Sequence, residues 1–512
     1  MNIMDFLGPL IGGVLVLDNF TIWAFIILGT VIGVIVGALP GVGATMTYGM
    51  LLPFTFTLET DVAIALLLSI SVGNAFGNSI PAILMGIPGS PSAILTVIDG
   101  YNLHKKGESG LALAVAWVAA MAGQAISIVL FVLMVVPLMA MAYNFGDPEK
   151  FALFLLGIVA IASLTGDNVV KGLMAGGVGF IIGIVGLDPN SPLPRFTFGI
   201  SILRTGFDIA PVMIGLLALS ELFRSSRQVF KWEARIDTKH AAKFPPLYKL
   251  KDTIWPILSG TFIGTFISAI PGAGATPAAM ISYQQAQLFA KRPEEFGKGS
   301  IEGLAANEAA QNASNSGEAA PALALGLPTS GSMVLLLAAL TIHGFIPGPN
   351  MIRQTPELFY AAIGGMLAAT LILTVTGWHL GLAMLRFVNI NRSIVIVLSI
   401  FTVMIGVYCL SYRIFDVWVV IGCGVVGYYL SRYGYAVAAA ALAVVLGRQL
   451  ERSLRLGLNL TDGDWLAMLS RPFTALFIFV TIAFLSIGIY RTMKFKRKMR
   501  DAKALTEATA AD

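Results

Sequence analysis

The chain has 512 residues, of which 56% are hydrophobic and only 12% are charged, and its formal net charge is +5. Soluble proteins carry roughly 25% charged residues, so this composition disfavours a cytoplasmic enzyme, a nucleic-acid-binding protein and a disordered scaffold. Long apolar runs recur along the chain and predict an all-α polytopic membrane protein.

The distribution of basic residues predicts how the chain is oriented in a membrane. Residues 1–104 contain no Lys or Arg, whereas eight basic residues lie between 224 and 251 and seven between 491 and 503. Basic clusters beside membrane spans stay in the cytoplasm. We therefore expect a cytoplasmic linker, a cytoplasmic C-terminus and a periplasmic N-terminus. The first residues lack the positive region of a signal peptide, so we expect the first apolar stretch to be retained.

About ten to thirteen transmembrane helices are expected. The strongest candidates lie near 20–38, 111–142, 151–166, 170–187, 208–223, 253–270, 358–388, 392–412, 416–431, 434–447 and 472–490. Two of them, 111–142 and 358–388, are long enough to be two tightly joined segments. Cys409 and Cys423 lie in apolar segments and indicate neither a disulfide framework nor a metal site.

The first helix is expected to break at a Gly/Pro motif. Pro removes a backbone donor and Gly permits unusual backbone angles, while Thr45 can begin a new helix. A second break follows near residues 81–92, with polar residues just before it. Together these breaks give the first candidate site residues, Pro40, Gly41, Gly43, Thr45, Asn74, Asn78, Ser79 and Ser90.

The second part of the chain repeats this arrangement. Its two breaks and the polar segment between them give the remaining candidates, Pro271, Gly272, Gly274, Thr276, Asn307, Glu308, Asn312, Ser314, Asn315 and Ser330. Asn307, Gln311, Ser314 and Glu318 share one helical face. Their side chains either bridge packed helices or supply oxygen ligands to a substrate or coupling cation.

The two sets of motifs match in order and nearly in register. Pro40 corresponds to Pro271 and Pro81 to Pro321, with a short insertion around residues 291–298. We interpret the chain as two homologous transmembrane halves, 1–235 and 251–490, joined by a basic linker (236–250) and followed by a basic tail (491–512). If the first half starts outside and the second inside, the halves are inverted-topology repeats with broken or re-entrant helices. Such breaks at matching positions indicate a transporter binding site.

The absence of Lys and Arg from these motifs bears on how an anion could be held. An anionic substrate would meet helix N-termini and hydroxyl groups rather than an ion pair. No P-loop lysine follows Gly43, which leaves an ion gradient as the energy source. An anion channel is the alternative. A less favoured one is an intramembrane serine hydrolase that uses Ser330 or Ser332 with His343.

At these residues the chain resembles a known family. The segments Gly37-Ala-Leu-Pro-Gly-Val-Gly-Ala-Thr45, Asn74-Ala-Phe-Gly-Asn-Ser-Ile-Pro81, Gly86-Ile-Pro-Gly-Ser-Pro-Ser92, Pro271-Gly-Ala-Gly-Ala-Thr-Pro277 and Asn307-Glu-Ala-Ala-Gln-Asn-Ala-Ser-Asn-Ser-Gly317 are similar to the large membrane subunit of the tripartite tricarboxylate transporters, the TctA type.

The resemblance, which covers about residues 10–490, implies the function and partners. It implies a non-enzymatic carrier in the bacterial inner membrane that takes up a tri- or dicarboxylate with Na⁺ or H⁺. It also implies a small four-helix membrane subunit and a periplasmic solute-binding protein as partners. No cofactor beyond the coupling ion is expected.

Overall fold

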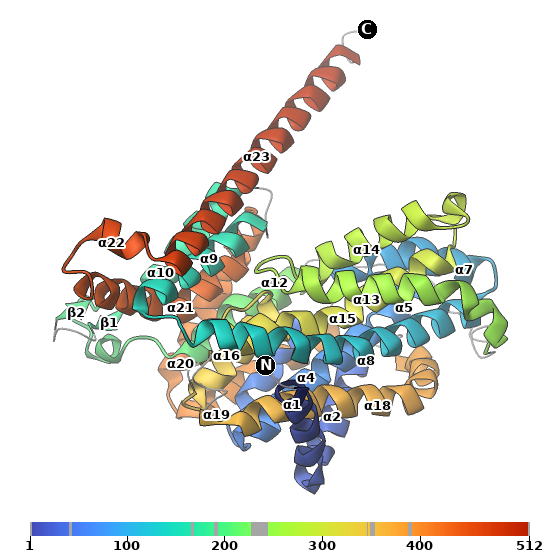
Figure 1. Cartoon of the computed structure of the whole chain (residues 1–512), viewed down its shortest axis with the longest axis horizontal. Helices are drawn as coiled ribbons and strands as arrows, with labels where there is room; N and C mark the ends of the chain where they lie inside the picture. The colour runs from blue at the N-terminus through green and yellow to red at the C-terminus, as the bar shows by residue number, and fades with distance from the viewer. Residues whose placement is uncertain are drawn as a thin grey trace.

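The structure is a computed structural model that describes residues 3–39, 43–164, 168–188, 193–226, 244–345, 347–348, 354–387 and 392–509. Within these residues the fold is helical apart from one two-stranded antiparallel sheet, in which β1 (Gly186–Leu187) pairs with β2 (Pro194–Arg195) (Figure 1). The all-α polytopic fold class is therefore confirmed.

The helices of the N-terminal part are α1 (Ile3–Leu15), α2 (Phe20–Gly37), α3 (Ala44–Thr55), α4 (Thr60–Gly77), α5 (Ser79–Met85), α6 (Ile94–Thr96), α7 (Asn102–Lys105), α8 (Ser109–Ala142), α9 (Asp147–Leu164), α10 (Val169–Gly183), α11 (Ile209–Met213) and α12 (Ser220–Ser226). Those of the C-terminal part are α13 (Ile254–Ser268), α14 (Ala275–Phe289), α15 (Ile301–Leu325), α16 (Gly331–Ile342), α18 (Pro356–Phe387), α19 (Arg392–Ser411), α20 (Ile414–Arg432), α21 (Val437–Asn459), α22 (Trp465–Leu469) and α23 (Pro472–Thr509).

Seven helical segments of the described chain are long and apolar enough to cross a membrane. They are Phe20–Gly37, Thr60–Met85, Ser109–Ala142, Ile209–Ser226, Pro356–Met384, Ile414–Arg432 and Pro472–Met493. Length alone gives fewer spans than expected because other apolar helices, such as α10 and α16, are shorter. The stretches 111–142 and 358–387, which are long enough for two joined segments, each form part of one continuous helix, α8 and α18. Pro137 does not end α8, whose apolar side chains continue to pack on both sides of it.

Small residues let two helix pairs pack backbone to backbone. A Cβ atom on Gly33 of α2 would lie 2.4 Å from the Ile70 carbonyl oxygen of α4. A Cβ atom on Gly264 of α13 would lie 2.5 Å from the Ala310 carbonyl oxygen of α15. These two contacts occupy matching positions of the sequence motifs. In a membrane such close approach supplies the van der Waals contact that holds helices together.

The hairpins α2–α3 and α13–α14 enter the helix bundle from opposite ends. Helices α4 and α15 are neighbours and antiparallel, since Ser71 bonds to Asn315 and Gln311 bonds to the Ala75 carbonyl. The base of α2–α3 lies at the start of α4, where Phe56 stacks on His343 and Thr60 bonds to that same ring. The base of α13–α14 lies near the start of α15, at the end of the molecule where Figure 1 shows α7.

One ion pair and one hydrogen bond hold the base of the α13–α14 hairpin. Lys291 Nζ lies 2.9 Å from Asp252 Oδ1, so the chain before α13 is tied to the chain after α14. Asn102 of α7 donates to the Gly297 carbonyl oxygen at 3.0 Å. The residues that join α14 to α15 therefore pack on the segment that precedes α8.

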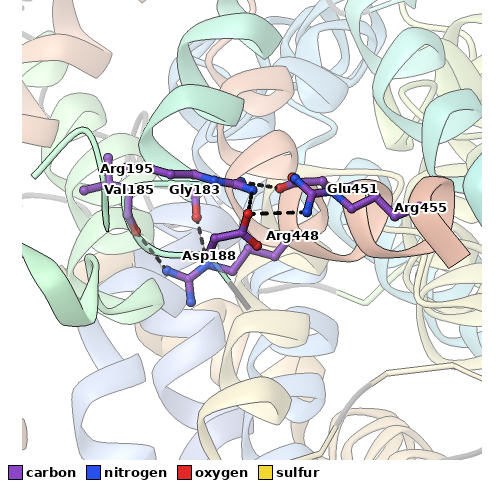
Figure 2. A network of polar contacts seen from close by, with 7 residues as sticks. All are labelled: Gly183, Val185, Asp188, Arg195, Arg448, Glu451 and Arg455. Carbon is purple, nitrogen blue, oxygen red and sulfur yellow. Dashed lines mark hydrogen bonds and ion pairs between the residues drawn. The ribbon is translucent and has the colours of Figure 1, made fainter. Parts of the chain in front are cut away.

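A network of charged side chains fastens the β1–β2 hairpin to the C-terminal half of α21 (Figure 2). Arg195 and Arg455 both bind Asp188 and Glu451, and Arg195 Nη1 lies 2.8 Å from Glu451 Oε2. Arg448 donates to the carbonyl oxygens of Gly183 and Val185 at the end of α10. The network lies at the end of the molecule opposite α7 and α14 (Figure 1).

Candidate functional site

The helix breaks from both halves of the chain meet around one cavity of about 250 Å³. Pockets for drug-sized ligands measure roughly 300–1,000 Å³, so this cavity suits a smaller organic molecule. Its lining residues are Ala44, Ser71, Asn74, Ala75, Asn78, Ser90, Ser92, Ile161, Gly272, Ala273, Gly274, Ala275, Thr276, Gln311, Ser314, Asn315, Glu318, Thr329, Ser330, Gly331, Ser332 and Ala438.

Left-handed glycines turn the chain back toward the cavity after α5 and after α15. Gly86 has φ 67° and Gly326 has φ 71°, a region that suits glycine because it has no Cβ. Each glycine is followed by a Pro and then by a Ser-x-Ser sequence. Both turns therefore present a pair of hydroxyl groups, Ser90 with Ser92 and Ser330 with Ser332, to the same space.

The hydroxyl pairs have nearly the same geometry in the two halves. The Oγ atoms of Ser90 and Ser92 are 2.8 Å apart, and those of Ser330 and Ser332 are 3.0 Å apart. Ser330 also accepts a hydrogen bond from the Met333 backbone N–H and so caps the N-terminus of α16. The partial positive charge of that helix end then faces the cavity.

The tip of the α13–α14 hairpin forms another wall. Gly272 has φ 81°, and its N–H donates to the Thr329 carbonyl oxygen at 3.2 Å. A Cβ atom at Gly272 would lie 2.7 Å from Ile161 Cα of α9. The tip is thus held between α9 and the turn that precedes α16, and only glycine fits there.

Glu318 is the one charged residue among the described residues that line the cavity. Ser330 donates a hydrogen bond to its carboxylate, and the Ala275 backbone N–H at the start of α14 donates another. Glu318 is buried, with 7% of the residue exposed. The remaining polar lining consists of hydroxyl and amide groups, so the cavity can hold an anion by hydrogen bonds but offers it no ion pair.

Half of the sequence-predicted site residues line the cavity. These are Asn74, Asn78, Ser90, Gly272, Gly274, Thr276, Ser314, Asn315 and Ser330. Five others, Thr45, Ser79, Asn307, Glu308 and Asn312, lie outside the lining, and Thr45 packs next to Gly331. Gly43 and Pro271 adjoin lining residues without contributing to the wall. Pro40 and Gly41 fall outside the described residues.

The expected capping role of the two threonines is wrong. Helix α3 begins at Ala44 with Gly43 as its cap, and α14 begins at Ala275 with Gly274 as its cap. Thr45 and Thr276 are therefore already inside their helices. Gly274 has φ 60°, a backbone region that favours glycine, whereas Gly43 has an ordinary extended backbone with φ −83°.

The predicted site residues leave out four that line the cavity, Ser71, Ser92, Thr329 and Ser332. Gln311 and Glu318 also line it, and they are predicted only as members of the polar helical face that they share with Asn307 and Ser314. The repeat contained a signal for some of them. Glu318 occupies the position that matches Asn78, and Ser332 the position that matches Ser92. Extending the predicted Asn78 to its counterpart identifies Glu318, whereas neither member of the pair Ser92 and Ser332 is a predicted binding residue.

The serine–histidine pair expected of a hydrolase is not assembled. Ser330 and Ser332 lie at the start of α16, and His343 follows its last residue. The 12 residues of this helix separate the groups by about 18 Å at 1.5 Å per residue. A nucleophile and its base must be within hydrogen-bond reach, so these residues do not form such a pair.

Comparison with known proteins gives one family and two relatives. The family described as "Tripartite tricarboxylate transporter TctA family" matches residues 23–442. An uncharacterized 52.8 kDa protein in the TAR-I ttuC' 3'region of Agrobacterium vitis is 33% identical over 480 residues, which are 93% of this chain and 94% of the relative. An uncharacterized protein in the TAR-II ttuC' 3'region of the same organism is 30% identical over 234 residues, 46% of this chain and 97% of the relative. No solved structure matches the chain.

Proposed function

Because the chain belongs to the tripartite tricarboxylate transporter TctA family, we propose that it carries a tri- or dicarboxylate across the bacterial inner membrane, driven by a Na⁺ or H⁺ gradient. In this proposal it is the large permease subunit. A small four-helix membrane subunit and a periplasmic solute-binding protein complete the system, and the binding protein delivers the substrate.

The observation that carries this proposal is the cavity itself. Its walls come from the helix breaks of both parts of the chain, and two hydroxyl pairs lie in it at matching positions. Irregular backbone inside a membrane is tolerated only where it is buried in protein or lines a cavity. Discontinuous helices of this kind form the substrate sites of secondary transporters.

Electrostatics favours symport over uniport. A carboxylate substrate entering this cavity meets the Glu318 carboxylate, and none of the described lining residues is basic. Two like charges in a site of low dielectric repel each other strongly. A cation bound near the substrate weakens this repulsion, so binding of the anion and binding of the cation support each other.

We also propose that residues 1–235 and 251–490 are inverted-topology repeats. The opposite entry of the α2–α3 and α13–α14 hairpins supports this, as do the matching glycine contacts of α2 with α4 and of α13 with α15. The basic linker (236–250) and tail (491–512) then lie in the cytoplasm and the N-terminus in the periplasm. Substrate would reach the cavity alternately from the two sides.

Uptake by proteoliposomes tests the proposed function. The full chain is reconstituted with the small subunit, the binding protein is added outside, and labelled citrate or a dicarboxylate is supplied under an imposed Na⁺ or pH gradient. We expect accumulation above the equilibrium level that collapses when the gradient is dissipated. Absence of uptake of every carboxylate under either gradient would contradict the proposal.

The anion-channel alternative gives a different result in the same vesicles. A carrier exchanges internal unlabelled substrate for external labelled substrate without net flux, because its binding site must return across the membrane. A channel gives no such counterflow and no accumulation driven by the cation gradient. Counterflow that requires the binding protein would favour the carrier.

A further inference from the structure

A second buried carboxylate lies on α15, outside the cavity. Glu308 is 0% exposed. Its Oε2 atom accepts a hydrogen bond from Ser79 Oγ at 2.5 Å, and its Oε1 atom accepts one from Thr96 Oγ1. Asn307 Nδ2 donates to the same Thr96 oxygen at 2.7 Å. Among the described residues no Lys, Arg or His forms an ion pair with this carboxylate.

The amide side chains near Glu308 each donate a hydrogen bond through their NH₂ group. Asn312 Nδ2 donates to the Glu308 carbonyl oxygen at 3.0 Å, and Gln311 Nε2 donates to the Ala75 carbonyl oxygen at 2.9 Å. Asn78 Nδ2 donates to Asn74 Oδ1 at 3.1 Å. Because the acceptors of Asn312 and Gln311 are backbone carbonyl oxygens, the NH₂ group of each must face them, and the orientation of these two amides is fixed.

The oxygen atoms of the same amides are left without a donor. Among the described residues nothing donates a hydrogen bond to the side-chain oxygens of Asn78, Asn307, Gln311 and Asn312, and all four are buried. Buried polar atoms are nearly always paired, so each exception calls for an explanation. The four unpaired atoms of these amides are all oxygens. Two of them lie close to Glu308 in the chain, because Asn307 directly precedes it and Asn312 follows one helical turn later.

Neither a proton nor a water molecule alone can both neutralise the Glu308 carboxylate and pair the amide oxygens. A proton on Glu308 would remove the buried charge but would donate only one hydrogen bond, which leaves the amide oxygens unpaired. Water could pair the oxygens but would leave the charge uncompensated. A cation bound by oxygen atoms does both. The single carboxylate among neutral oxygens matches a charge of +1.

We propose that Glu308, the amide oxygens of Asn307 and Asn312 and the hydroxyl oxygens of Ser79 and Thr96 bind one sodium ion, in a site separate from the cavity. Asn312 Nδ2 lies 3.0 Å from the Glu308 carbonyl oxygen, so the Asn312 carboxamide with its unpaired oxygen lies next to the Glu308 backbone. The inference rests on the proposed function, for which this sodium is the coupling ion.

The site is connected to the cavity through adjacent residues. Ser79 follows Asn78, and Asn312 follows Gln311, while Asn78 and Gln311 both line the cavity. A sodium ion that fixes Ser79 and Asn312 also fixes these two neighbours. Sodium bound outside the cavity thereby prepares the cavity wall for the substrate.

Sodium binding can be measured without substrate or partners. The purified full chain in detergent is titrated with NaCl, with choline chloride keeping the ionic strength constant, and the midpoint of thermal unfolding is recorded. Ligand that binds only the folded state raises this midpoint with concentration. We expect a saturable rise for the unaltered chain and no sodium-dependent rise for Glu308→Gln.

Because Glu308→Gln would also lose sodium binding if it failed to fold, the test includes a second ligand variant and a control variant. Asn312→Ala removes one proposed ligand, and the Glu308 carbonyl keeps its place in the helix, so we expect a folded protein whose half-saturating NaCl concentration rises at least tenfold. Glu302→Gln is the matched control on the same helix, because Glu302 lies outside both the cavity lining and the proposed sodium site. We expect its half-saturating concentration to stay within twofold of that of the unaltered chain.

Two results would overturn the inference. One is an unaltered chain whose unfolding midpoint does not respond to sodium. The other is a response that Glu318→Gln removes and Asn312→Ala leaves unchanged, which would place sodium in the cavity. Proteoliposome uptake separates this failure from failure of the proposed function. Carboxylate accumulation driven by a pH gradient alone, in a chain without a sodium response, would reject the site and keep the carrier.

Discussion

The hydroxyl pairs are the residues best placed to hold a carboxylate group. Ser92 and Ser332 occupy matching positions, and their side chains line the cavity beside Ser90 and Ser330. Hydrogen bonds to charged groups contribute about 1.5–3 kcal/mol. We therefore expect Ser332→Ala, and likewise Ser92→Ala, to raise the KM for the carboxylate roughly 10- to 100-fold in proteoliposome uptake.

A surface serine provides the control for this prediction. Ser486 lies exposed on α23 and donates only to the Ile482 carbonyl of its own helix. Ser486→Ala should leave the KM within twofold of that of the unaltered chain. If Ser332→Ala behaved like Ser486→Ala, the hydroxyl pairs would not contact the substrate.

Gly272 provides a second prediction at the scale of one residue. Its φ of 81° and the 2.7 Å distance from a built Cβ to Ile161 Cα leave no room for a side chain. Gly272→Ala should displace the α13–α14 tip from the cavity and abolish uptake, while the protein still inserts into the membrane. Gly422→Ala is the control, because nothing lies within 4 Å of a Cβ at that helical position. Normal uptake by Gly272→Ala would exclude the tip from the site.

The sequence motifs predict which residues lie near the cavity better than they predict the structural role of each residue. Gly and Pro mark where a helix must end, so Asn74, Asn78 and Ser90 beside the breaks were predicted and lie in the wall. Which residue caps the next helix depends on the backbone angles of the turn, and the pattern alone did not distinguish Gly43 from Thr45. Glu308 was predicted beside these residues, but its separation from the cavity depends on three-dimensional packing.

At the scale of helices, the close approach of α13 to α15 determines where Glu308 and Glu318 lie. Gly264→Ala would place a Cβ atom 2.5 Å from the Ala310 carbonyl oxygen, which is backbone and cannot rotate away. Overpacking of this kind costs about 1–3 kcal/mol. We expect a lower midpoint of thermal unfolding in detergent, and a similar loss for Gly33→Ala at the matching contact of α2 with α4.

Gly177→Ala is the control for both helix contacts. Gly177 lies within α10, and nothing lies within 4 Å of a Cβ built there. Since alanine favours a helix over glycine, this variant should unfold at the same temperature as the unaltered chain or slightly higher. An unfolding midpoint of Gly264→Ala equal to that of Gly177→Ala would mean that the two helices can separate without loss.

The helices were predictable where their apolar runs are continuous and less so where they are polar. The run from 111 to 142 predicted most of α8. Helix α15 is fully buried for most of its length but rich in Asn, Glu and Ser, so its hydropathy does not identify a span. It is buried because α4, α8, α13 and α14 surround it. That arrangement arises from contacts between distant segments, which no local pattern encodes.

For the whole molecule, the proposed orientation can be tested with two reporter cysteines. Glu59 is exposed at the base of α2–α3, and Lys298 is exposed between α14 and α15. The proposal places the first in the periplasm and the second in the cytoplasm, because the two hairpins enter from opposite ends and the basic linker precedes α13. In a chain with Cys409 and Cys423 changed to Ser, a membrane-impermeant maleimide should label Glu59→Cys in intact cells and Lys298→Cys only after lysis. Labelling of both from the same side would exclude inverted repeats, since the two hairpin bases would then share one face of the membrane.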